Sequence, residues 1–414
     1  MHQQKVALVL GGTNPHIALI ENLKKRGYHT VLVDYLENPP AKEYADEHLQ
    51  ESTLDKDKVH EIAKTRKADL VIATCIDQAN VTACYVAEKL NLPRPYSYEI
   101  ASEIADKTRM KKKMLDNGIP TAKYIALKEG DTFNHFGLKF PLVIKPSDSN
   151  GSKGVRRVDD AKELNQYQED AFDVSRNKKV VVEEFIEGDE IGVDCIVSDG
   201  ITQIITMHKK RKPKRKDGSV IFSIGSISPP AISQNVEIQI LNIASTISRV
   251  FNLNNTPLLL QVIVNNEDVK VVEFAPRIGG GLNFRKIQLF KGYDIINASV
   301  ESYFGEMPKS KDMPLDYYYS ENHIYTEPGV FGRIEGIDKL IEDRIILEFY
   351  QNKRNGMLIN ASNSSSDRVG SFIVQGNTIE EIKQKLYKVY NTIKVIDSNN
   401  EVLKHQQNYK QLYL

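Results

Sequence analysis

At residues 141–146 the chain reads Pro-Leu-Val-Ile-Lys-Pro, and at residues 147–154 it continues Ser-Asp-Ser-Asn-Gly-Ser-Lys-Gly. The apolar run 142–144 has the length and composition of a buried strand. A lysine at the end of a strand offers a fixed positive charge, and a loop of small residues and glycines lets backbone amides wrap around phosphate oxygens. Taken alone, the loop is equally compatible with an ordinary hairpin whose lysine reaches out to solvent.

A second apolar strand, 180–182, leads into the acidic segment 183–190. The exposed backbone of this segment can hydrogen-bond the edge of a purine, and the Glu190 carboxylate can accept two ribose hydroxyls. By themselves, Glu183 and Glu184 are only charged residues at a strand end. Because Glu183 and Glu184 come after a glycine-containing loop in the same region of the chain, the two features together favour a nucleotide site.

Two further strands, 258–264 and 269–274, flank the turn residues Asn-Asn-Glu-Asp at 265–268. With a connection of three or five residues, Gln261 and Glu273 face each other across the hairpin, whereas four residues offset them by one. Mg²⁺ takes oxygen ligands, which a carboxylate, an amide and nucleotide phosphates supply. Arg277 follows directly, and a guanidinium can grip a phosphoryl group through two hydrogen bonds.

The N-terminal hundred residues alternate short apolar runs with segments of helical periodicity. After the first run, Val6 to Leu10, the segment Gly-Gly-Thr-Asn-Pro at 11–15 predicts a helix start capped by Thr13 or Asn14. Repeated strand and helix units predict a parallel sheet covered on both faces. The glycine spacing of a dinucleotide fingerprint is absent, so we predict no NAD site and interpret Asp34 as a capping or solvated residue.

The pattern changes near residue 105 and again near residue 305. We therefore predict an α/β chain: a Rossmann-like parallel-sheet domain at 1–105, an α+β domain at 106–305 that carries the motifs above, and a C-terminal α+β domain at 306–414. In the last part, 371–374 reads as a strand, and Thr378 with Glu381 forms a capping box for a helix.

Composition excludes several classes of partner. The 414 residues carry 55 Lys+Arg and 55 Asp+Glu, so the net charge of zero provides no field to hold nucleic acid or an anionic membrane. No apolar stretch approaches the ~20 residues of a membrane span, and the first apolar run is too short for a signal peptide. The 3 cysteines form no C-x-x-C pair. We expect a cytoplasmic protein without disulfides.

In this order, the motifs resemble those of the ATP-grasp superfamily over residues 5–305. The C-terminal region is similar to the closing segment of larger members, which implies that the domain at 306–414 closes the active site. The branch is similar to carbamoyl-phosphate synthase large chains and L-amino-acid ligases, and Glu-Phe-Ala-Pro-Arg-Ile-Gly-Gly-Gly at 273–281 with Ser-Pro-Pro at 228–230 looks most like the latter. The resemblance implies an ATP-grasp fold in which ATP phosphorylates a carboxylate. An amine then attacks the acyl phosphate to form an amide or peptide bond, releasing ADP and phosphate. The alternatives are a bicarbonate-dependent carboxylase or carbamoyl-phosphate-type enzyme, and a non-catalytic ATP-binding regulator.

The resemblance also implies site residues. The nucleotide would be held by Lys107, Lys145, Ser152, Lys153, Gly154, Glu183, Glu184, Phe185, Ile186 and Glu190. Gln261 and Glu273 would bind Mg²⁺, or Mn²⁺ in its place, and the catalytic residues would be Arg277 and Lys145. Arg285 and Asp77 are candidates for substrate binding. The partners would be small carboxylates and amines, with a homodimer as an open alternative and with neither nucleic acid nor membrane.

Two departures from the family pattern concern the metals. The family commonly has Glu or Asp at the position of Gln261, although synthase-like members use Gln, and it commonly has Asn at the position of Ala275. Because Ala275 follows Glu273 by two residues on the same strand face, one oxygen ligand is lost. A water or Asn283 is the replacement we consider, and the number of metals stays open between one and two.

One segment has no place in this scheme. Residues 209–216 carry seven positive charges in eight residues. The interpretation that we favour is a mobile, solvated loop; a lid over the acyl phosphate comes second, and nucleic-acid contact is the weakest. His16, His208 and His323 show no ligand spacing, and we expect them to be structural.

Overall fold

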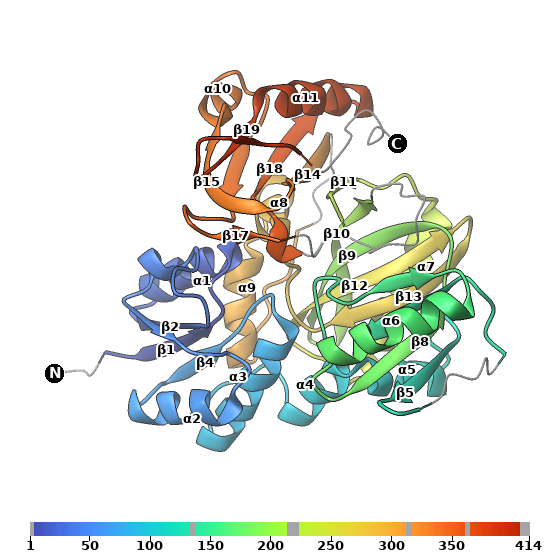
Figure 1. Ribbon diagram of the computed structural model, residues 1–414. Helices are drawn as coiled ribbons and strands as arrows, with labels where there is room; N and C mark the ends of the chain where they lie inside the picture. Colours follow the sequence, from blue (N-terminus) through green and yellow to red (C-terminus); the bar gives the residue numbers. More distant parts are fainter. Residues whose placement is uncertain (1–3, 132–136, 213–222, 312–316, 361–364, 406–414) are drawn as a thin grey trace.

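The computed structural model describes residues 4–131, 137–212, 223–311, 317–360 and 365–405. Three bodies of secondary structure surround a central junction (Figure 1). In the described residues no helix combines the length and apolar character that crossing a membrane requires.

The N-terminal body is a parallel sheet with helices on both faces, as the alternating pattern predicted. Its strand order is β3-β2-β1-β4. The strands are β1 (Val6–Leu10), β2 (His29–Asp34), β3 (Glu47–Gln50) and β4 (Leu70–Ile72). The helices are α1 (Asn14–Lys25), α2 (Lys56–Thr65), α3 (Asp77–Leu90) and α4 (Tyr98–Ala105), with a short 3₁₀ turn, η1 (Lys42–Tyr44). Thr13 caps α1, and α3 begins at Asp77, so this carboxylate lies at the carboxyl end of the sheet.

A small antiparallel sheet, ordered β5-β8-β6-β7, carries the glycine-containing loop. Its strands are β5 (Tyr124–Lys128), β6 (Leu142–Pro146), β7 (Arg156–Val158) and β8 (Lys179–Glu184). The helices α5 (Lys107–Asp116) and α6 (Ala161–Val174) accompany it. The predicted strand 142–144 is therefore real, and Lys145 lies one residue from its end.

A large sheet of eight strands, ordered β13-β12-β9-β10-β11-β14-β18-β16, crosses the predicted boundary at residue 305. Before that residue it contains β9 (Asp189–Ser198), β10 (Ile201–Arg211), β11 (Gly225–Ser228), β12 (Thr256–Asn265) and β13 (Asp268–Ala275). Beyond it come β14 (Tyr318–Ile324), β16 (Glu348–Gln351) and β18 (Gly370–Gly376). The helices of this region are α7 (Gln234–Val250), α8 (Asn283–Lys291) and α9 (Ile295–Glu301), followed by the 3₁₀ turn η2 (Ser302–Phe304). The domain limits at 105 and 305 stay a proposal, because the C-terminal strands continue the same sheet.

The C-terminal body adds a four-stranded sheet, β17-β15-β19-β20. It consists of β15 (Gly329–Glu335), β17 (Leu358–Ile359), β19 (Lys394–Asp397) and β20 (Val402–Leu403), with α10 (Ile337–Glu342), η3 (Ser365–Asp367) and α11 (Ile379–Thr392). Thr378 caps α11 by accepting from the Glu381 amide. The Glu381 carboxylate accepts from the Asn377 amide, one residue before the cap.

The two faces of the large sheet differ in chemistry, because side chains alternate along each strand. Ile191 and Val193 of β9 pack in one core with Val236 and Ile240 of α7. The intervening residues of β9, which include Glu190 and Asp194, point to the opposite face. That face turns toward the junction of the three bodies, where most of the proposed site residues gather.

Candidate active site

The hairpin β12–β13 brings Gln261 and Glu273 opposite each other through an irregularity in strand pairing that the sequence pattern does not show. Its connection holds two residues, since Asn265 pairs with Asp268. This register alone would place Gln261 opposite Val272. A β-bulge between Gln261 and Val262 inserts one extra residue, and Gln261 pairs with Glu273. Directly paired residues have side chains on the same face, so two oxygen donors lie side by side.

Lys107 joins this pair to the glycine-containing loop. Its Nζ lies 3.5 Å from Glu273 Oε2 and donates to the Ser149 carbonyl at 2.6 Å. The Lys107 amide also donates to the Ser147 carbonyl. Lys107, in the first turn of α5, thus contacts both the loop 147–154 and Glu273, the proposed metal ligand.

The loop 147–154 also contacts the N-terminal body and the C-terminal body. The side chain of Gln78 in α3 donates to the backbone carbonyl of Asp148 at 2.8 Å and accepts from the side-chain amide of Asn150 at 2.8 Å. A Cβ on Gly151 would lie 2.5 Å from Ser365 Oγ, so the C-terminal body touches the loop closely. Gly151 and Gly154 both have positive φ, at 60° and 74°, which explains glycine at these positions. Ser152 and Lys153 lie between them, in the same loop.

Lys145 is part of a buried triad with Glu183 and Lys111. Glu183 Oε1 lies 2.6 Å from Lys145 Nζ, and Glu183 Oε2 lies 2.7 Å from Lys111 Nζ. Burial opposes ionisation of Glu183, but the two ammonium groups outweigh it and lower the pKa of Glu183 to about 2. Burial lowers the pKa of Lys111 to about 8 against the attraction of Glu183. Two cations share one carboxylate, so the triad keeps a net positive charge while Lys111 is protonated.

Lys111 also ties the triad to the hairpin. Its Nζ donates to Thr121 Oγ1 at 2.7 Å, and Thr121 Oγ1 donates to the Val271 carbonyl at 2.7 Å. Val271 precedes Glu273 by two residues. The contact therefore fixes the small sheet that carries Lys145 relative to the hairpin that carries the metal donors.

Two backbone amides at the end of β8 and directly after it donate to other parts of the chain. The Glu184 amide donates to the Lys123 carbonyl and the Phe185 amide to the Pro141 carbonyl, both at 2.9 Å. The Ile186 amide has no acceptor among the residues that the structure describes. This amide therefore remains open to an acceptor of a bound molecule.

Glu190 is paired with lysines of the basic run. Lys210 Nζ lies 2.5 Å from Glu190 Oε1 and donates to Gln261 Oε1 at 2.8 Å, and Lys212 Nζ contacts Glu190 Oε2. Burial opposes ionisation of Glu190, but Lys210 and Lys212 outweigh it and hold its pKa well below the usual range. Glu190 therefore stays ionised and available as an acceptor.

The basic run is not a loop in its described half, so the interpretation that we favoured was wrong there. Residues 209–211 form the end of β10 and pair with β9 and β11. Lys209 meets Asp189 at 2.8 Å on one face, and Lys210 meets Glu190 on the other. The repulsion expected among these lysines is cancelled because each lysine has an acidic residue of the neighbouring strand β9 on its own face of the sheet. Residues 213–216, with the rest of the proposed lid, lie outside the described residues.

Arg277 and Asp77 come together although 200 residues separate them. The guanidinium donates through Nε at 2.7 Å and a terminal nitrogen at 2.8 Å to the two oxygens of Asp77. Burial opposes the charge on both groups, but each holds the other ionised: the pKa of Asp77 is lowered and that of Arg277 is raised. Both residues line one pocket with Lys107, Gln261 and Glu273. Asp77 is thus placed to orient Arg277.

Arg285 lies elsewhere. It pairs with both oxygens of Glu348 and lines a second pocket, of about 700 Å³, between α1, α8 and β16. That pocket shares no lining residue with the one at Glu273. The structure therefore does not bring Arg285 to the other site residues.

Asn283, the replacement considered for the ligand lost at Ala275, donates through its side-chain nitrogen to Asp194 Oδ1 at 3.4 Å. Burial raises the pKa of Asp194 to about 6. Its Oδ2 has no hydrogen-bond partner among the described residues and lies 3.6 Å from His208 Nδ1. Burial keeps the pKa of His208 well below its usual value, so the ring is neutral. These groups lie next to the glycine segment 279–281, because a Cβ on Gly279 would approach Asp194 Oδ1 to 3.1 Å.

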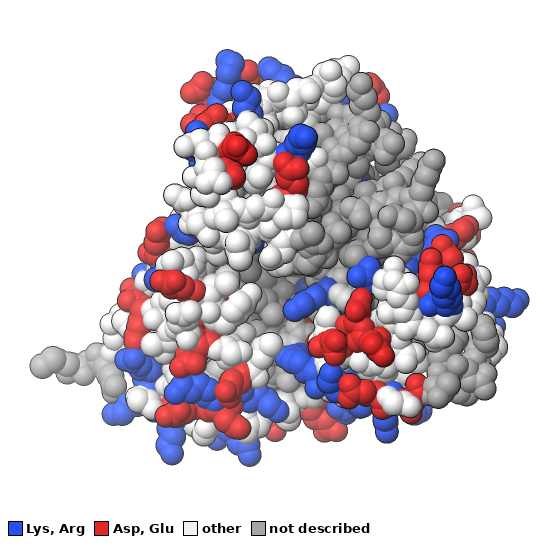
Figure 2. All heavy atoms as spheres, viewed as in Figure 1, with Lys and Arg blue, Asp and Glu red and all other residues white. Residues whose placement is uncertain are grey.

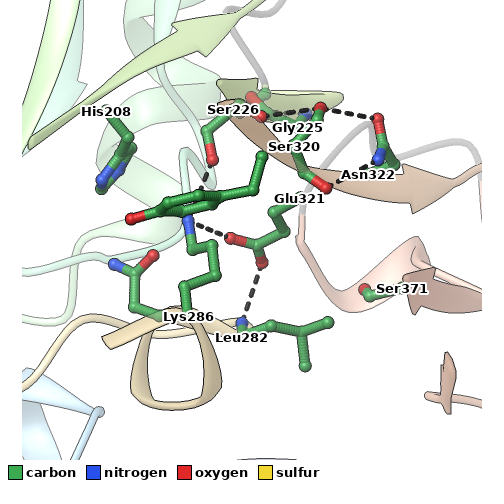
Figure 3. Close-up of polar contacts among 12 residues, drawn as sticks. His208, Gly225, Ser226, Leu282, Lys286, Ser320, Glu321, Asn322 and Ser371 are labelled. Atoms are coloured by element: carbon green, nitrogen blue, oxygen red, sulfur yellow. Dashed lines mark hydrogen bonds and ion pairs between the residues drawn. The ribbon is translucent and has the colours of Figure 1, made fainter. Parts of the chain in front are cut away.

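A buried polar cluster joins this segment to the C-terminal strands (Figure 3). Lys286 of α8 pairs with Glu321 of β14 at 2.7 Å and donates to Ser226 Oγ at 3.0 Å. Glu321 also accepts from the Leu282 amide at 2.8 Å. The start of α8 is thus bound to β11 and β14, which sets the position of the glycine segment relative to the large sheet.

The donor set suits a divalent ion of the magnesium type. Glu273 offers a carboxylate and Gln261 an amide oxygen, both hard donors, with Lys107 within reach of the same carboxylate. Within the described residues no group of three or more His, Cys, Asp or Glu side chains forms a ready-made metal site. The remaining ligands would have to come from phosphates and water.

The sequence interpretation missed Lys111 and Gln78, and it singled out Lys210 only as part of the basic run 209–216. A signal existed for the first: Lys107 and Lys111 are four residues apart and share a helix face. For Gln78 there was none, because its contact depends on how the N-terminal body docks. Lys and Arg side chains are interspersed with Asp and Glu side chains over much of the described surface in Figure 2, in line with the net charge of zero.

Comparison with known families and structures gives consistent results. Residues 138–285 match the family "ATP-grasp domain", and residues 322–397 match "L-amino acid ligase C-terminal domain 2". The chain is 24% identical over 254 residues to the L-arginine-specific L-amino acid ligase of Bacillus subtilis, a match that spans 59% of this chain and 60% of that relative.

Solved structures agree in fold over nearly the whole chain. The crystal structure of L-amino acid ligase from Bacillus licheniformis superposes with a TM-score of 0.78 at 19% identity, covering 96% of this chain and all of that one, 100%. The biotin carboxylase domain of the Hydrogenobacter thermophilus 2-oxoglutarate carboxylase, solved with MgADP and bicarbonate, gives 0.75 at 15% identity, covering 98% of this chain and 92% of that one.

Proposed function

We propose that this chain, which carries an ATP-grasp domain followed by an L-amino acid ligase C-terminal domain, is an ADP-forming ligase that joins a carboxylate to an amine. One observation carries the proposal: Gln261 and Glu273 face each other beside Lys107, and Lys107 holds the glycine-containing loop that follows Lys145. Metal donors, phosphate-binding cations and a loop of backbone amides thus converge on one place.

Each group has a role in phosphoryl transfer, which depends on positioned charge more than on a strong base. Lys145 and Lys107 bind the phosphates, loop 147–154 covers them, and Glu190 accepts the ribose hydroxyls. Glu273 and Gln261 would hold Mg²⁺, which neutralises phosphate charge when it is bound.

Arg277, oriented by Asp77, stabilises the phosphoryl group as it passes to the substrate carboxylate. The amine then attacks the acyl phosphate. The similarity to L-amino acid ligases makes amino acids the first substrates to try, and we propose that the protein works in the cytoplasm.

The test is release of ADP and phosphate with Mg·ATP across a matrix of amino acids, other carboxylates and bicarbonate, with hydroxylamine present to trap an acyl phosphate. Release that depends on one carboxylate, with a hydroxamate formed, supports the ligase. Release with bicarbonate alone shows a carboxylase. Protection against heat by ATP without any release leaves two alternatives, a substrate outside the panel and the non-catalytic regulator, and shifts the weight to the regulator. Lys145→Ala and Glu273→Ala should each abolish turnover, and wild-type rates in either variant would refute the site.

A further inference from the structure

One short segment of the C-terminal body, η3 with Arg368 directly after it, contacts two parts of the proposed site. At its start, Ser365 meets the glycine-containing loop, because a Cβ on Gly151 would lie 2.5 Å from Ser365 Oγ. At its end, Arg368 meets the glycine segment that follows Arg277, because a Cβ on Gly281 would lie 3.7 Å from Arg368 Nη1. A 3₁₀ turn rises about 2 Å per residue, so these two contacts lie about 6 Å apart.

The guanidinium of Arg368 is held at one edge and open at the other. Its Nε donates to the hydroxyl of Tyr325 at 2.9 Å, and the Tyr325 side chain is buried. Its two terminal nitrogens have no hydrogen-bond or ion-pair partner among the residues that the structure describes. Because the guanidinium is planar, a fixed Nε also orients the open edge.

Two other cations close to the glycine segment are already paired. Lys286 is bound to the Glu321 carboxylate (Figure 3), and Arg277 is bound to both oxygens of Asp77. Arg368 has no such carboxylate within the described part of the chain. It therefore offers a positive charge that an anionic ligand can use.

The glycine segment leaves space for a ligand in front of this charge. A Cβ on Gly280 would have no atom within 4 Å, so the space beside this residue is open. Gly281 has a φ of 66°, and a side chain there would approach both Glu321 and Arg368. Glycine at position 281 thus keeps the open edge of Arg368 accessible from the segment.

The chemistry of amide formation indicates which anion belongs there. The carboxylate that receives the phosphoryl group loses its own negative charge in that step, and Arg277 is the cation assigned to it. A carboxylate on the amine substrate stays charged throughout the reaction, so its transfer from water into the site requires a separate cation. Arginine suits this role, since two of its N–H groups bind the two oxygens of a carboxylate side by side.

We propose that Arg368 binds the carboxylate of the amine substrate, so that the molecule attacking the acyl phosphate is an amino acid held by its carboxylate. The proposal rests on the proposed function, because it requires an acyl phosphate beside Arg277. It makes Arg368 a specificity-determining residue for the second substrate and gives it no part in binding the nucleotide.

The experiment compares L-amino acids with their C-terminal amides as the amine, using the full chain, Mg·ATP and the carboxylate that the hydroxamate assay identifies. The amide keeps the amino group and the side chain but lacks the negative charge. Its amino group is the weaker base, so without recognition of the carboxylate the amide would be the better nucleophile at neutral pH. We expect kcat/KM of the wild type to be about tenfold higher for the amino acid, the effect of one charge-assisted contact.

Substitution of Arg368 should remove this preference. Arg368→Met should raise KM for the amino acid about tenfold and leave KM for the amide and for ATP nearly unchanged. Arg368→Lys should restore part of the preference, because lysine supplies the charge without the paired N–H groups. Both variants should still form the hydroxamate, since hydroxylamine carries no carboxylate.

Arg333→Met is the matched control. It removes an arginine of the same body whose side chain is 53% exposed and pairs with Glu335 on the surface. This variant should keep the wild-type preference for the amino acid over the amide.

Equal use of amino acid and amide by the wild type would overturn the proposal, and hydroxamate formation in the same protein would leave the ligase function standing. A loss in Arg368→Met that is equal for the amino acid and the amide would overturn it as well. A wild type that forms no hydroxamate with any carboxylate would instead refute the proposed function, and this proposal with it.

Discussion

The buried triad of Lys111, Glu183 and Lys145 makes the sharpest prediction. Lys111→Met keeps the length and apolar stem of the side chain but removes one of the two ammonium groups on Glu183. Breaking a buried ion pair costs about 3–5 kcal/mol when it leaves a charge without a partner, and because Lys145 still pairs with Glu183 here, we take the low end, about 3 kcal/mol. For a chain of 414 residues the unfolding entropy is about 0.9 kcal/mol/K, so Tm should fall by about 3 °C.

The same substitution should also weaken nucleotide binding. With Lys111 gone, Glu183 neutralises Lys145, and the net positive charge of the triad disappears. One charge at a separation of about 10 Å and an effective dielectric constant of about 20 contributes about 1.7 kcal/mol, which is more than tenfold in Kd. Differential scanning calorimetry measures the first effect, and calorimetric titration with an ATP analogue measures the second.

Lys112→Met is the control, because Lys112 is 72% exposed and pairs with Asp116 on the surface. It should change Tm and Kd little. If Lys111→Met also leaves both quantities unchanged, Lys111 is not the partner that keeps Lys145 available for phosphate. A fall in Tm without a change in Kd would make the triad purely structural.

Three further predictions concern the same site. The pKa of Glu183 is about 2 in the folded state against an ordinary value of 4.5, so its stabilisation of the fold is complete above pH 4.5 and is lost as the pH falls toward 2; Tm of Glu183→Gln should therefore drop less than that of the wild type between pH 5 and pH 3, and parallel curves would contradict this. Gly192→Ala would place a Cβ 2.2 Å from His208 Nε2 and should destabilise the protein by about 1–3 kcal/mol in thermal melts, whereas Gly280→Ala, with nothing within 4 Å, should not. Asp77→Asn removes the charge that orients Arg277 and should lower kcat more than tenfold with KM for ATP nearly unchanged; an equal loss in both would show a general disturbance of the nucleotide site.

Local patterns predicted much of this molecule. The alternation of strand and helix segments in residues 1–105 was enough to predict a parallel sheet, because hydrophobic periodicity and turn residues reflect local backbone preference. The strand ending at Lys145 and the capped helix after Thr378 follow from the same kind of information. These features depend on neighbours in the chain, which the sequence displays directly.

The site itself needed contacts between distant segments. Gln261 faces Glu273 only because a bulge corrects the register of a two-residue turn. Arg277 meets Asp77 across 200 residues, and lysines 209 and 210 form a strand because the acids of β9 neutralise them. Composition and periodicity carry no information on such pairs, because register, docking and charge compensation are decided by the packing of whole sheets and not by local preference. The sequence by itself determined the elements and the chemical types of the site residues; the tertiary structure decided which of them meet.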